Sequence, residues 1–257
     1  LFQAKPMTTI NYSNASVAIR DDVTASHNQV IDHLTSPGTW WTASERRAIA
    51  EEARAARSCQ LCADRKAALS PFSVSGHHDG PGDLDPQVVD IIHRIITDPG
   101  RLTRSWYEHV INESELSPEH YVELLSVAIF LNSLDVFSTA VGVDPAQLPA
   151  PKDGQPTKQR PTSASIDESW VPRLTPSQAD APEWIALYGE RSQVSEVERA
   201  LSAVPAEMHC LNSIAETHYM AFRHVPDPRF SHPNRALSRA QTELVASRVS
   251  LINECFY

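Results

Sequence analysis

Residues 117–141 read SPEHYVELLSVAIFLNSLDVFSTAV, and this stretch decides the predicted fold. Ser117 followed by Pro118 is typical of a helix start, because serine caps free backbone N–H groups and proline fits the first turn. Strongly apolar residues follow as far as about Val141, so we predict an apolar helix. The longest unbroken apolar run, residues 127–131, is far shorter than the roughly 20 residues of a membrane span.

Three segments before this stretch also predict helices. The first covers about residues 44–68, with Ser44 as its cap. The second begins at Asp85 and Pro86, and the third covers about residues 101–112. Apolar residues recur at helical spacing in the first two, namely Ala48, Ile49, Ala53 and Ala56, then Val88, Val89, Ile92 and Ile95. Together these segments predict an all-α bundle.

Composition restricts the function classes. Of 257 residues, 41% are apolar, and 19 prolines against 8 glycines favour helices separated by proline-rich connections. The net charge of -10 opposes binding to nucleic acid or to an anionic membrane. No apolar leader is present, so we expect a cytoplasmic protein.

The proline distribution suggests a division of the chain. Eight prolines occur between Asp144 and Pro182, a density that excludes a long helix. Helical spacing returns at 195–203, at 205–222 and from Ser238 onward. We therefore predict a tag remnant at 1–6, an N-terminal arm at 7–39, a helical domain at 40–143, a proline-rich connection at 144–182 and a second helical domain at 183–257.

Residues 236–257 read ALSRAQTELVASRVSLINECFY. This segment resembles the core of the alkylhydroperoxidase D and carboxymuconolactone decarboxylase family. In that family a Leu-Ser start leads into a Glu, a helix, an Asn and a Cys-x-x-Cys followed by a His. Glu243 lies twelve residues before Cys255, which is the family's spacing between its proton-relay glutamate and its first cysteine. The partner of Cys255 would stand at position 258, directly after Tyr257, so we expect a chain cut at a cysteine or a selenocysteine.

An internal echo supports the resemblance. Residues 116–135 run parallel to the C-terminal segment, and Glu123 takes the place of the relay glutamate. Asp135 and Ser138 stand where the two cysteines would be. The resemblance therefore implies a double-domain fold of two alkylhydroperoxidase D-like helical bundles, the first degenerate and the second incomplete at its C-terminus.

The resemblance implies a thiol- or selenol-dependent peroxide reductase, in which Cys255 and residue 258 form the redox pair and Glu243 relays protons. Its partners would be a hydroperoxide substrate, a dithiol or lipoyl-type reductant and further copies of the chain; it needs no cofactor. His218 is a further candidate for the site, although a hydrogen-bonded packing histidine is the simpler interpretation. Two alternatives remain open: a non-catalytic scaffold or redox sensor, and a cofactor-free decarboxylase of carboxymuconolactone type.

Cys59 and Cys62 form a possible second redox pair. Three-residue spacing on a helix places both sulfurs on one side, and Arg57, Arg65 and Lys66 can lower a thiol pKa. Two core thiols are the simpler alternative. A zinc site with the loop residues His77, His78 and Asp79 is a weaker one, because the spacing is not a standard one. We therefore predict no metal.

Overall fold

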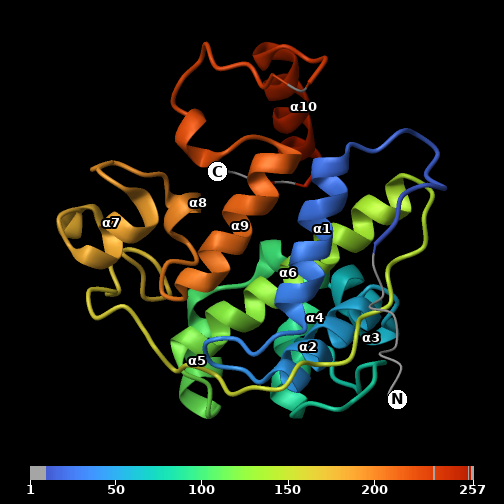
Figure 1. Cartoon of the computed structure of the whole chain (residues 1–257). Helices are drawn as coiled ribbons and strands as arrows, with labels where there is room; N and C mark the ends of the chain where they lie inside the picture. Colours follow the sequence, from blue (N-terminus) through green and yellow to red (C-terminus); the bar gives the residue numbers. More distant parts are fainter. Residues whose placement is uncertain (1–9, 234, 254, 256–257) are drawn as a thin grey trace, which may run out of the picture.

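The structure is a computed structural model that describes residues 10–233, 235–253 and 255. These residues form ten α-helices, four short 3-10 helices and no β-strand, with one isolated bridge between Ser165 and Arg173. The predicted all-α fold class is therefore confirmed. The predicted tag remnant and Tyr257 lie outside the described residues. Figure 1 shows α6 passing through the middle of the helices and α10 at the edge of the molecule.

Helix α6 (Pro118–Ala140) is the central element, and it begins where the sequence predicts. The Ser117 side chain accepts a hydrogen bond from the backbone N–H of His120. Among the described helices only α6 is long and apolar enough to cross a membrane, but 61% of its most apolar window is buried inside the protein. Such burial is typical of the core helix of a soluble bundle.

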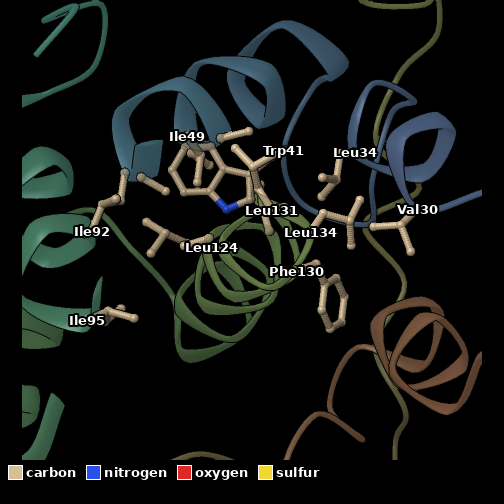
Figure 2. Close-up of a cluster of buried hydrophobic side chains, with 14 of the residues drawn as sticks. Val30, Leu34, Trp41, Ile49, Ile92, Ile95, Leu124, Phe130, Leu131 and Leu134 are labelled. Atoms are coloured by element: carbon tan, nitrogen blue, oxygen red, sulfur yellow. The ribbon is translucent and has the colours of Figure 1, made fainter. Parts of the chain in front are cut away.

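Four helices pack around α6: α1 (Asp21–Leu34), α2 (Ala43–Ala56), α4 (Pro86–Thr97) and α9 (Pro205–His218). Figure 2 shows the side chains at the centre of this packing. Leu124, Leu131 and Leu134 of α6 face residues from α1, α2 and α4. The start of α4 also follows the prediction, since Asp85 accepts a hydrogen bond from the N–H of Gln87. Helix α5 (Arg104–Glu113) covers the third predicted segment.

The predicted single helix at 44–68 is wrong, because the structure has two helices there. Helix α2 starts earlier than predicted, because Thr42 caps it in place of Ser44: Thr42 and Glu45 bond to each other's backbone N–H groups in a capping box. The chain turns after Ala56, and α3 covers Gln60–Ala67. After this turn, α3 packs on α4.

Helix α1 is one element that the sequence pattern does not predict. Its 14 residues include three aspartates, two histidines and an asparagine, so its apolar content is low. Val30, Ile31 and Leu34 are nevertheless buried in the main core. The predicted N-terminal arm thus contributes a full helix to the bundle.

The proline-rich connection and the helix that follows it are anchored by tryptophans. Trp170 and Val171 pack against the main core, and Trp184 of α7 (Pro182–Tyr188) is buried in a small cluster of its own. After α8 (Glu196–Arg199), helix α9 adds Met208 to the core of α1 and α6. The division into two domains stays a prediction, and this core extends across its boundary.

One buried ion cluster links α2, α6 and α9. Arg46 bonds to Glu123 and, at 2.7 Å, to Glu207, and all three side chains are inaccessible to solvent. Glu207 also pairs with His33 of α1 at 2.9 Å. Burial lowers the pKa of Arg46, but the two carboxylates outweigh it and the pKa ends above its ordinary value. Arg46 therefore stays charged in the core.

Candidate metal centre

Two cysteines meet two histidines where α3 packs on α4. Cys59 is the N-cap residue of α3 and Cys62 lies in its first turn, so both sulfurs lie at the start of the helix. Both side chains are buried. The apolar cluster around them is small, since it holds Leu61 besides the two cysteines, with Val74 at its edge.

The histidines come from separate elements. His78 lies in the irregular segment between the 3-10 helix at Pro71–Ser73 and α4, and its Nδ1 is 3.6 Å from each cysteine sulfur. His93 belongs to α4, and its Nδ1 is 3.2 Å from the Cys62 sulfur. The four ligand atoms all lie within 4.8 Å of one another.

Each histidine has a carboxylate behind it. His93 Nε2–H donates to Glu52 Oε1 at 2.8 Å, and His78 Nε2–H donates to Asp90 Oδ1 at 3.0 Å. Arg65 donates to the same Asp90 oxygen at 2.5 Å, so two donors converge on one acceptor. With Nε2 committed to the carboxylate, Nδ1 is the ring atom left for a metal, and such carboxylate–histidine pairs typically surround bound metals.

Three of the sulfur–nitrogen distances can be compared with those of a tetrahedral zinc site. With Zn–S near 2.3 Å and Zn–N near 2.0–2.1 Å, neighbouring sulfur and nitrogen ligands lie about 3.5–3.6 Å apart. The two distances from His78 match this value, and that from His93 to Cys62 is slightly shorter. Two thiolates with two imidazoles are a donor set that favours zinc.

The electrostatics favour a thiolate at Cys59 and a neutral imidazole at His93. Burial raises the pKa of Cys59, but hydrogen bonds from the backbone of Asp79 and Cys62 and from His78 bring it below its ordinary value. Burial and the nearby His78 lower the pKa of His93. This lowering outweighs the opposite effect of Glu52, so His93 is neutral at pH 7. Burial lowers the pKa of His78, but Asp90 and the two cysteines raise it to about 10. A metal would therefore displace a proton from His78.

Gly80 keeps Glu52 close to His93, because a Cβ on Gly80 would lie 2.8 Å from Glu52 Cδ and collide with its Oε1. Gly80→Ala is expected to displace the carboxylate and weaken zinc binding by about 10–100-fold, as the loss of an outer partner typically does. Competition with a chromophoric chelator measures this change. Gly100→Ala is the matched control, since its Cβ meets no atom within 4 Å. Equal zinc affinities of the two variants would contradict the role of Glu52.

Sequence reasoning found only part of this centre. It considered Cys59, Cys62 and His78 together, with His77 and Asp79 as further candidates. In the structure, the Asp79 carboxylate accepts a hydrogen bond from the N–H of Gln60, and His77 is exposed. It missed His93, which stands among the apolar residues of α4 and reads as a packing residue. The signal was a second histidine fifteen positions after the first. The geometry now favours the metal interpretation that the spacing alone made weak.

The predicted catalytic residues lie elsewhere. Glu243 is in α10 (Arg239–Ile252) and accepts hydrogen bonds at 2.5 Å from Tyr219 and from Arg239. Cys255 is exposed just beyond α10. At 1.5 Å per residue, the helix places its end at Ile252 about 14 Å from Glu243 along the axis. The continuous helix does not bring the glutamate to the cysteine, and their catalytic roles stay predictions.

His218, the remaining predicted site residue, lies beside His27 of α1. Its Nε2 is 2.6 Å from Nε2 of His27, whose Nδ1 is 2.6 Å from the hydroxyl of Tyr12. Burial lowers the pKa of both histidines, that of His27 to about 4. At neutral pH this pair is therefore uncharged, as hydrogen-bonded packing histidines are.

Comparison of the chain with known protein families, curated proteins and solved structures finds no match.

Proposed function

We propose that this chain is a zinc protein whose metal is held by Cys59, Cys62, His78 and His93. The observation that carries the proposal is the convergence of the four ligand atoms within 4.8 Å. Both histidines offer Nδ1 and have carboxylates at Nε2, which supports the assignment independently. Four protein ligands complete a tetrahedron, so the centre is of the structural kind and leaves no position for substrate.

The surrounding fold explains what the metal would do. Residues 74–85 contain no helix or strand, and the apolar cluster at Cys59 and Cys62 is too small to hold them. A zinc ion shared by α3, His78 and α4 would fix this segment against the bundle. Metal binding then contributes directly to the free energy of folding.

Hydrogen–deuterium exchange on the full chain tests this role. With zinc, the backbone amides of residues 74–85 are expected to exchange slowly, and a chelator is expected to accelerate them. Amides within α6 serve as the internal control, because that helix lies in the main core away from the cysteines. Exchange at 74–85 that does not respond to zinc would overturn the proposed role.

Two finer predictions stand beside this proposal. Hydroperoxide reduction by Cys255 with Glu243 rests on the sequence resemblance. A cytoplasmic location is supported by the four cysteines, all of which are free thiols in the structure. Reduced thiols persist in that compartment, and zinc thiolate centres need them.

A further inference from the structure

A pocket of about 330 Å³ opens beside the two cysteines, between α3 and the end of α4. Cys59 and Cys62 line it together with Ala63 and Thr97. Its volume is several times the roughly 30 Å³ share of a water molecule, so a small molecule can enter. The cysteines are otherwise buried, so this pocket offers a route by which a small molecule can approach them.

The pocket wall also carries positive charge. Arg57 and Lys66, both exposed, line it on the side of α3. Cysteines bind zinc as thiolates, and the thiolate is also the form that attacks peroxides. The Cys59 sulfur also accepts hydrogen bonds from the backbone N–H groups of Asp79 and Cys62.

The two sulfurs are placed to react with each other. They stand three residues apart at the start of one helix, on the same side of it. Cys210 lies on α9 and Cys255 follows α10, so neither belongs to the cluster. Burial, together with Glu207, raises the pKa of Cys210 well above its ordinary value, which makes that thiol a poor nucleophile.

We infer that Cys59 and Cys62 form a disulfide when a hydroperoxide enters this pocket, and that the zinc ion then leaves. The inference rests on the proposed zinc centre and makes it a redox-sensitive one. One thiolate attacks the peroxide, the O–O bond breaks, and with one proton a sulfenic acid and an alcohol or water form. The second thiolate attacks the sulfenic sulfur, and with another proton water leaves. The peroxide gains the two electrons that the sulfurs lose, while zinc keeps its charge.

The test uses the zinc-loaded full chain in the Cys210→Ser, Cys255→Ser background, which keeps only the proposed pair. Hydrogen peroxide is added, zinc release is followed with a chromophoric indicator, and peptide masses are measured before and after reduction. We expect loss of all bound zinc, together with a loss of two hydrogens from the peptides that contain Cys59 and Cys62. A thiol reductant should restore zinc binding.

Ala63→Leu narrows the pocket without touching a ligand and is expected to slow zinc release at unchanged zinc affinity. Holo protein that keeps its zinc and both thiols under peroxide would overturn the inference and leave the proposed function intact. Oxidation to sulfinic acid without a disulfide would also overturn the inference, as would equal rates of zinc release from Ala63→Leu and its parent. A chain that binds no zinc at these residues would instead refute the proposed function.

Discussion

Cys62→Ser is expected to abolish the stabilisation of this protein by zinc. Zinc at a thousand times its dissociation constant raises the unfolding free energy of a protein by about 4 kcal/mol, and the variant should lose that gain. Cys62 is the ligand closest to both histidines, at 3.2 Å from His93 and 3.6 Å from His78. Its hydroxyl replacement cannot supply a thiolate. Thermal unfolding at buffered free zinc, with and without a chelator, measures the difference.

Cys210→Ser is the matched control for this prediction. Cys210 is a partly buried thiol on α9 outside the metal cluster, so its replacement should leave the response to zinc unchanged. A Cys62→Ser protein that is stabilised by zinc as strongly as the parent would contradict the assignment of this ligand.

Arg46→Met is expected to lower the unfolding free energy by about 3–5 kcal/mol, the usual cost when one partner of a buried ion cluster is removed. Without the guanidinium, the buried carboxylate of Glu123 loses its cation, and that of Glu207 is left with His33. Burial already raises the pKa of Glu123 above its ordinary value, in spite of Arg46. Urea unfolding followed by circular dichroism gives the difference.

Arg47→Met provides the neighbouring control. Arg47 pairs with Glu51 one turn along α2, but both side chains are about one third exposed. Exposed pairs of this kind contribute roughly 0.3–0.5 kcal/mol. Adding Glu123→Gln to Arg46→Met should recover part of the lost stability, because it removes one unpaired charge. Equal effects of Arg46→Met and Arg47→Met would contradict the account of the buried cluster.

The helices with strong caps and apolar faces could be predicted from sequence. Ser117 and Pro118 mark the start of α6, and Asp85 marks that of α4, because capping is a local property of a few residues. Helix α1 could not be predicted this way. Its buried face includes His27 beside apolar residues, and the ring of His27 finds its partners in Tyr12 and His218, which are distant in sequence.

The candidate site shows the same division. The spacing of Cys59 and Cys62 is visible in the sequence, but their orientation depends on the turn that separates α2 from α3. His93 becomes a candidate ligand only when α4 packs on α3. Its hydrogen bond to Glu52 joins residues 41 positions apart, and no local pattern records it. Tertiary contacts therefore decide whether a cysteine pair of this kind lies beside histidines.

The most direct test of the central claim is metal analysis of the purified full chain, followed by X-ray absorption at the zinc edge. The account predicts one zinc ion per chain, with two sulfur ligands at about 2.3 Å and two nitrogen ligands at about 2.0–2.1 Å. A chain that retains no zinc when purified and reconstituted under reducing conditions, or a zinc shell without sulfur, would contradict it.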